Sequence, residues 1–164
     1  MKYNRSKPIG EVLKTAGLVC DAQIQVALID RQYNRDLRVG EILALRGWIE
    51  QQTADFFVEE WHLAIEQANK YPLGYYLQRA GLLTKKQINS VLEEQKKLWI
   101  KFGAVATLQG LIEETTVDFF LSNLFPTASL ESPFINKRNS ERTIALEDKK
   151  TVTQINLEDI PWIN

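Results

Sequence analysis

The chain has 164 residues, of which 45% are hydrophobic and 25% are charged, a composition typical of one compact globular domain or two small ones. Its formal net charge is −1, so no basic surplus exists to neutralise a phosphate backbone, and we expect no nucleic-acid binding. The single cysteine, Cys20, excludes an intrachain disulfide and is typical of a reducing compartment. Because the N-terminal residues lack an apolar signal segment and no apolar run approaches about 18 residues, we expect a cytoplasmic protein that does not insert into membranes.

All the glycines of the chain follow one pattern. They form four pairs, and the two members of each pair are seven residues apart: Gly10 and Gly17, Gly40 and Gly47, Gly74 and Gly81, Gly103 and Gly110. The interval fits two turns of helix, and the second glycine falls where a helix needs a left-handed residue to end. A helix-start signal follows, clearest in Thr84-Lys85-Lys86-Gln87, which has the form of a capping box. The pattern predicts an all-α fold built from four helix–turn–helix repeats.

In chain order, the four copies span residues 8–31, 38–61, 72–95 and 101–124. A longer amphipathic helix is expected in the second part of each copy. In copy two the predicted apolar face contains Ala54, Val58, Trp61 and Ile65, and we expect this helix to continue to about Asn69. In copy three the predicted face contains Ile88, Val91, Leu92 and Trp99.

The copies alternate in character along the chain. Copies one and three begin with proline, whereas copies two and four begin with a basic residue and share a paired phenylalanine, at 56–57 and 119–120. The alternation predicts two tandem modules of two repeats each, over residues 7–70 and 71–126. We expect one phenylalanine of each pair to fill the core of its module and the other to contact the second module.

Residues 127–164 differ from the repeats because they contain no glycine, many charges and no helical period. This composition predicts an irregular C-terminal tail that is flexible or loosely docked. The end of the tail regains apolar residues, and the candidates for partner binding are Leu157, Ile160, Trp162 and Ile163. Two interpretations stay open: an extended piece that lies on the protein's own helices, or a linear motif that docks on a partner.

With the four copies aligned, the repeat resembles the motif of the MshEN family, Arg-Leu-Gly-x-x-Leu-x-x-x-Gly followed by spaced leucines and a glutamine. This domain occurs at the N-terminus of type II secretion and type IV pilus assembly ATPases, and the resemblance covers residues 8–124. It implies that each motif pair could bind one cyclic di-GMP as a regulatory ligand, through apolar motif side chains, the motif arginine and the motif glutamine. It implies no other cofactor.

Carried over by position, the family's polar contacts are incomplete in this chain. The arginine positions hold Pro8, Arg38, Pro72 and Lys101, and the glutamine positions hold Arg31, Trp61, Gln95 and Leu124. Each lost charge-assisted hydrogen bond removes about 1.5–3 kcal/mol, so the eroded pattern predicts weakened nucleotide binding, with the first module as the better candidate site. The implied ligand-binding residues are Ile9, Gly10, Leu13, Arg31, Arg38, Val39, Gly40, Leu43, Gln95 and Lys101.

Candidate catalytic chemistry is not apparent in the sequence. There is no phosphate-binding Gly-x-x-x-x-Gly-Lys-Ser/Thr loop, no nucleophile with an evident base and no Cys/His cluster typical of a metal site, and the one histidine, His62, is expected at the surface. We therefore expect no enzyme. The sequence favours a regulatory adaptor that binds a partner protein in type IV pilus or secretion regulation, and the alternative is a cyclic di-GMP receptor that uses Arg38. A tetratricopeptide-like solenoid fits the uneven glycine spacing poorly.

Overall fold

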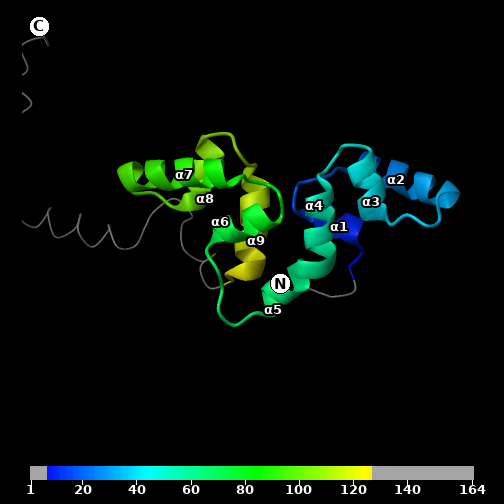
Figure 1. The fold of residues 1–164 in the computed structure, drawn as a ribbon, viewed down its shortest axis with the longest axis horizontal. Coiled ribbons are helices and arrows are strands. Elements are labelled where there is room, and N and C mark those ends of the chain that lie inside the picture. The colour runs from blue at the N-terminus through cyan, green and yellow to red at the C-terminus, as the bar shows by residue number, and fades with distance from the viewer. Residues whose placement is uncertain (1–6, 127–164) are drawn as a thin grey trace, which may run out of the picture.

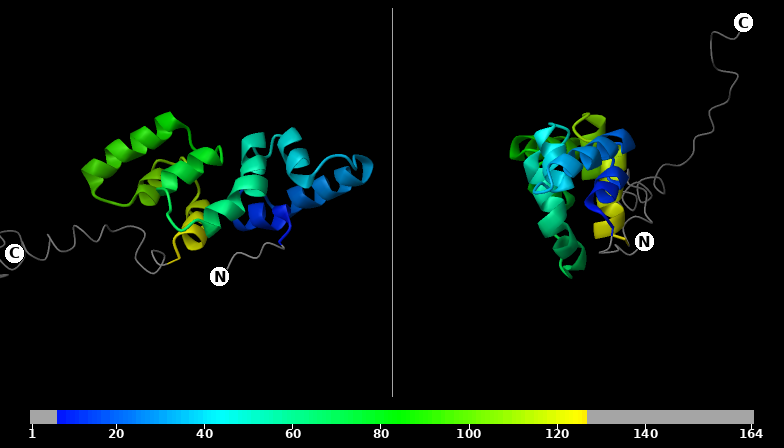
Figure 2. Two further views of the ribbon diagram at one scale, coloured as in Figure 1. Left: turned by 60° about the horizontal axis from the view of Figure 1, so that its bottom comes forward. Right: turned by 90° about the vertical axis from the view of Figure 1, so that its right-hand side faces the viewer.

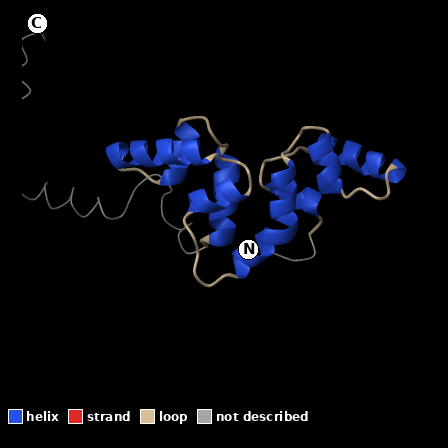
Figure 3. Cartoon of the chain, in the orientation of Figure 1, coloured by secondary structure: helices blue, strands red, loops and turns tan. Residues whose placement is uncertain are grey.

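The computed structural model describes residues 7–126, and within this range the protein is entirely helical (Figures 1 and 3). This confirms the predicted all-α class. The helices of the first half are α1 (Ile9–Thr15), α2 (Asp21–Tyr33), α3 (Val39–Leu45), α4 (Gln51–Asp55), the π-helix η1 (Phe56–Glu60) and α5 (Trp61–Glu66). Those of the second half are α6 (Leu73–Arg79), α7 (Lys85–Leu98), α8 (Phe102–Leu108) and α9 (Glu114–Leu124).

All four glycine turns have the same hydrogen-bond pattern. In the first, the N–H of Gly17 donates to the carbonyl of Lys14 and the N–H of Leu18 donates to the carbonyl of Leu13, both at 2.9 Å. The same pair of hydrogen bonds recurs at the other three turns, and it defines the Schellman motif that ends a helix. The motif needs a left-handed residue, and the second glycines have φ values of 66–72°. The predicted bend at each second glycine is therefore confirmed.

The first glycine of each pair lies near the start of a short helix and allows close packing against it. At Gly10 and Gly103 the nearest side chain belongs to the following long helix, whereas Gly40 and Gly74 lie against the other short helix of their half. A Cβ atom added to Gly40 would lie 3.2 Å from Cδ1 of Ile9, which precedes Gly10 on α1. In the second half, a Cβ atom on Gly74 would lie 3.1 Å from Cζ of Phe102, the first residue of α8. The contact equivalent to that of Gly40 is made by Gly103, where a Cβ atom would lie 3.7 Å from Cδ2 of Leu73, so both halves bring their short helices together in this way. The proposed boundary at residues 70 and 71 stays a prediction.

The long helix of copy two is not a uniform α-helix. Five of its residues form η1, and this wider turn leaves Val58 exposed between the buried Ala54 and Trp61, so the prediction of one continuous apolar face is wrong at Val58. The helix also ends at Glu66, short of the expected Asn69. At this end Gln67 has extended backbone, and Nζ of Lys70 donates to the terminal carbonyls of Ala64 (2.5 Å) and Ile65 (2.6 Å).

Helix α7 begins with the predicted capping box: the N–H of Thr84 donates to Oε1 of Gln87 (2.8 Å), and the N–H of Gln87 donates to Oγ1 of Thr84 (3.3 Å). The predicted apolar face of this helix is only partly correct. Val91 is buried, whereas Leu92 and Trp99 are exposed. Trp99 lies beyond the end of the helix, where the backbone turns left-handed, so it leaves the face that the helical period assigns to it.

Candidate functional site

The two halves hold each other through equivalent contacts that cross between them. Thr53, on α4 of the first half, donates its hydroxyl to the carbonyl of Ala80 at the end of α6 in the second half (2.7 Å). Thr116, on α9 of the second half, donates to the carbonyl of Ala16 at the end of α1 in the first half (2.8 Å). Both hydrogen bonds are buried. Figure 2 shows the first half, coloured blue to cyan, side by side with the second half, coloured green to yellow.

The glycine turns of copies one and three are also the points where the halves touch. A Cβ atom on Gly17 would lie 3.3 Å from Cβ of Thr115, and one on Gly81 would lie 3.3 Å from Cδ of Gln52. At Gly47 and Gly110, by contrast, an added Cβ atom would meet nothing within 4 Å. We call the contacts of Gly17 with α9 and of Gly81 with α4, together with the two threonine hydrogen bonds, the crossed contacts.

An aromatic cluster lies between the halves. Its members are Phe56, Phe57, Trp61, Phe119 and Phe120. Phe56 stacks on Phe120 with ring centroids 6.2 Å apart, and Trp61 stacks on Phe119 at 5.1 Å. Phe57 also meets both rings of the other half, at 6.1 and 5.9 Å. The prediction that each phenylalanine pair divides its members between core and contact is therefore wrong, because all four rings pack across the boundary and belong to one continuous core region.

The residues that the MshEN resemblance implies for ligand binding fall into two groups. Leu13 and Leu43 are 0% exposed, Gly10 and Gly40 are buried, and Ile9 and Val39 are half-buried. Among these residues, Ile9 of copy one closely approaches Gly40 of copy two. Leu13 and Leu43 are part of the core, so a ligand could reach them only if the short helices moved apart.

The polar members of the implied site are spread over both halves. Arg31, on α2, and Arg38, which precedes α3, are exposed in the first half, and the main-chain N–H of Arg38 donates to Glu41 Oε2 at 2.6 Å. Gln95, on α7, and Lys101, which precedes α8, are half-buried in the second half. Their role in binding stays a prediction. The candidate partner-binding residues Leu157, Ile160, Trp162 and Ile163 lie outside the described residues.

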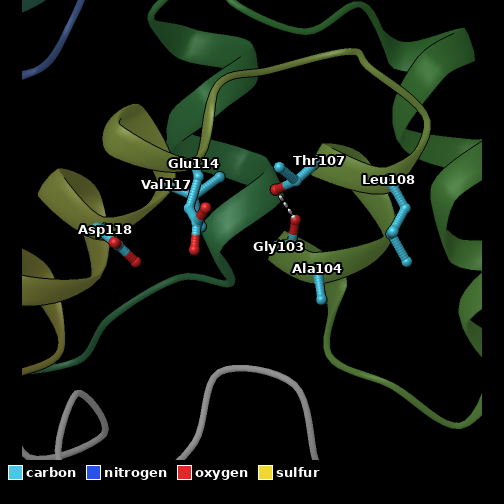
Figure 4. Close-up of a pocket in the computed structure, with 7 residues that line it drawn as sticks. All are labelled: Gly103, Ala104, Thr107, Leu108, Glu114, Val117 and Asp118. Atoms are coloured by element: carbon cyan, nitrogen blue, oxygen red, sulfur yellow. Dashed lines mark hydrogen bonds between the residues drawn. The ribbon is translucent and has the colours of Figure 1, made fainter.

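A pocket of about 200 Å³ opens between α8 and α9 (Figure 4). It is lined by Gly103, Ala104, Thr107, Leu108, Glu114, Val117 and Asp118. The hydroxyl of Thr107 is turned back to the carbonyl of Gly103 at 2.7 Å, so the α8 wall offers mainly apolar surface. The α9 wall carries two carboxylates, and the pocket could therefore take an apolar side chain accompanied by a cation. This pocket was not predicted from the sequence. The pattern that could have indicated it is the run of small residues in α8.

Large apolar side chains are exposed at equivalent places in the two halves. Leu45, at the end of α3, and Leu108, at the end of α8, are each 73% exposed. Beyond α7, Trp99 is 60% exposed, and its neighbour Leu98 is exposed as well. Trp99 also has φ 59° and ψ 24°, a left-handed conformation that a bulky residue rarely adopts. Such strain accumulates at functional sites more often than elsewhere, so Trp99 and Leu98 are the strongest interaction candidates on the described surface.

Replacing Trp99 by glycine should raise the free energy of unfolding by about 1 kcal/mol, because glycine adopts the left-handed conformation without a Cβ clash. Trp99→Ala is the matched control, since it removes the indole and keeps the strain. Urea denaturation followed by circular dichroism measures both variants. If the glycine variant is destabilised as much as the alanine variant, the indole supports the fold and is not kept for another purpose.

The shifted ionisable groups of the described range are explained by local structure. The guanidinium of Arg46 hydrogen-bonds the carboxylate of Asp30 (Nη2 to Oδ1, 2.9 Å) and holds the pKa of Asp30 below its usual value. Arg79 pairs in the same way with Glu60, and this raises the pKa of Arg79. Burial lowers the pKa of Lys70, which caps α5. Each of these groups thus has a structural role. His62, which we expected at the surface, is half-buried.

Residues 7–126 contain neither a metal-binding cluster nor a membrane-spanning helix. No group of three or more His, Cys, Asp or Glu side chains in this range is arranged to hold a metal ion. None of the helices in the same range combines the length and apolarity needed to cross a bilayer. Cys20 is exposed and is the N-cap residue of α2.

The fold and its contacts define a class of protein, an all-α protein of paired helix–turn–helix units joined across a crossed interface. The chain is 37% identical, over 171 aligned positions, to an uncharacterized protein of Picosynechococcus sp. (strain ATCC 27264 / PCC 7002 / PR-6). The alignment covers 94% of this chain and 92% of the relative, so the chain belongs to the same family as that protein. No family model matches the chain, so the MshEN resemblance stays a prediction. No solved structure matches it.

Proposed function

We propose that this chain is a non-enzymatic adaptor that binds a partner protein through exposed apolar side chains of its helical units. The observation that supports this proposal is Trp99, an exposed indole held on a left-handed backbone beside the exposed Leu98. Tryptophan is enriched among the residues that dominate binding energy at protein interfaces. The resemblance to MshEN domains suggests that the partner belongs to a type IV pilus or secretion machinery.

Affinity capture from the native organism tests the proposal when the full chain is compared with two variants. Trp99→Gly should lose the captured partner while its fold stays intact. Tyr33→Ala removes an aromatic side chain that is 83% exposed on the other half, so it serves as the control and should keep the partner. The captured protein must then bind the purified chain directly. Equal capture by the wild type and the Trp99→Gly variant would count against the proposed surface.

A cyclic di-GMP receptor is the second candidate, favoured by the exposed Arg38 next to the close approach of Ile9 and Gly40. Because most polar positions of the motif are eroded, binding should be weak, and Arg38→Ala should remove any heat seen in a calorimetric titration. Arg35→Ala is the control, since Arg35 is also exposed and precedes the motif. No heat at about millimolar ligand ends this candidate, whereas saturable heat lost only in Arg38→Ala establishes it.

A further inference from the structure

A second pocket, of about 130 Å³, lies where the first half passes into the second. We call it the tyrosine pocket. Its apolar lining comes from Phe56, Leu63, Ala64, Tyr71, Tyr75 and Tyr76. These residues belong to η1, α5, the connection at 67–72 and α6, so the pocket follows the boundary between the halves. The function proposed above does not use it.

The tyrosine pocket combines a fixed floor with exposed apolar walls. Tyr76 is almost fully buried, and its hydroxyl accepts a hydrogen bond from the main-chain N–H of Tyr71 at 3.1 Å. The rings of Tyr71 and Tyr75 lie 4.3 Å apart, and both side chains are exposed, as is Leu63. A paired aromatic surface beside an exposed leucine suits an aromatic side chain from another segment.

The described chain ends beside this pocket. Phe125 packs edge-on against Tyr76, with ring centroids 6.4 Å apart, and Pro126 is the last residue described. The sequence continues through residues 127–164, in which the apolar residues return at 155–163, with Trp162 next to Pro161. A flexible chain of about 35 residues has a root-mean-square span of about 30 Å, so a segment tethered here reaches the pocket at high effective concentration.

The family alignment includes this part of the chain. Because it covers 94% of the chain, it extends over most of residues 127–164. Most of the segment that follows Pro126 is therefore shared by the two proteins. A pocket at the point where a shared segment begins favours an occupant from the same chain over an unrelated one.

We propose that residues 155–163 dock in the tyrosine pocket of their own chain, with the indole of Trp162 against the rings of Tyr71 and Tyr75. The docking itself requires no partner. Its regulatory consequence rests on the proposed function: a partner that recognises Trp162 and its apolar neighbours must first displace them from the pocket, so binding would be coupled to release of the segment.

Paramagnetic relaxation in the full chain tests the docking. With Cys20→Ser, and Asn164→Cys carrying a spin label, the amide signals of residues 63–76 should lose intensity. Trp162→Ala in the same chain should restore them without touching the helical core, and Tyr75→Ala should do so from the pocket side. Tyr33→Ala is the control that should leave the loss unchanged.

The outcomes separate the proposal from its alternatives. Unchanged signals at 63–76, or a loss of intensity confined to another surface, would overturn it. A second sample mixes spin-labelled chains without ¹⁵N and ¹⁵N-labelled chains without a spin label. Loss of intensity at 63–76 in that sample means that the segment docks on a second copy, which also overturns the proposal. Because no partner is present, a negative result leaves the adaptor function to its own test.

Discussion

Replacing Phe120 by alanine should lower the free energy of unfolding by about 3–5 kcal/mol. The side chain is 0% exposed, and its ring packs against Phe56 and Phe57 of the other half at 6.2 and 5.9 Å. It also contacts Trp61 at 5.1 Å. Truncation therefore leaves a cavity between the two halves, and both halves should be destabilised together.

Chemical denaturation followed by circular dichroism measures the effect of Phe120→Ala. The control is Tyr33→Ala, at an exposed aromatic position, which should change the free energy of unfolding by no more than about 0.5 kcal/mol. The wild type should unfold in one transition, because one core region joins the halves. A loss no larger than that of the control would show that the aromatic cluster does not hold the halves together.

Replacing both Thr53 and Thr116 by valine should cost about 1–3 kcal/mol at each site. Valine keeps the shape of threonine and removes the hydroxyl, so the buried carbonyls of Ala80 and Ala16 lose their crossed hydrogen bonds. The two sites use different partners at separate turns, and their effects should therefore add in the double variant.

Thr53→Ser and Thr116→Ser are the matched controls for the valine variants, since serine keeps the donor and loses only a methyl group. Denaturation of the single and double variants gives the comparison. Serine and valine variants of equal stability would mean that the methyl group, and not the hydrogen bond, makes the contribution. A large effect at one site with none at the other would mean that the two crossed contacts are not equivalent.

The turns could be predicted from the sequence because each depends on local chemistry. The Schellman motif requires a glycine at the end of the short helix, and this glycine comes seven residues after the first and is followed by two apolar residues. The capping box likewise joins Thr84 and Gln87, which are only three residues apart. The crossed contacts could not be predicted in this way. The partners of Thr53 and Thr116 lie 27 and 100 residues away, and a threonine near a helix start has the same appearance in sequence whether or not it reaches another half.

Periodicity also failed where the backbone departs from a regular helix. The π-helical turn at 56–60 rotates the residues that follow it, and the left-handed Trp99 removes a side chain from the predicted face. The sequence pattern also could not separate ligand-binding residues from core residues. Leu13 and Leu43 were assigned by resemblance to a motif whose apolar positions fit both a nucleotide site and a helical core, and burial is what distinguishes the two. The two pockets depend on side-chain packing across helices, which no single segment encodes.

The crossing of the two halves is the claim on which the account most depends, and nuclear Overhauser effects test it directly. The side chain of Thr115 lies against Gly17, and that of Gln52 lies against Gly81, each 3.3 Å from the position of an added Cβ atom. We therefore expect cross-peaks between the protons of Gly17 and Thr115 and between those of Gly81 and Gln52. Cross-peaks that instead join Gly17 to Gln52 and Gly81 to Thr115 would place each turn against its own half and contradict the account.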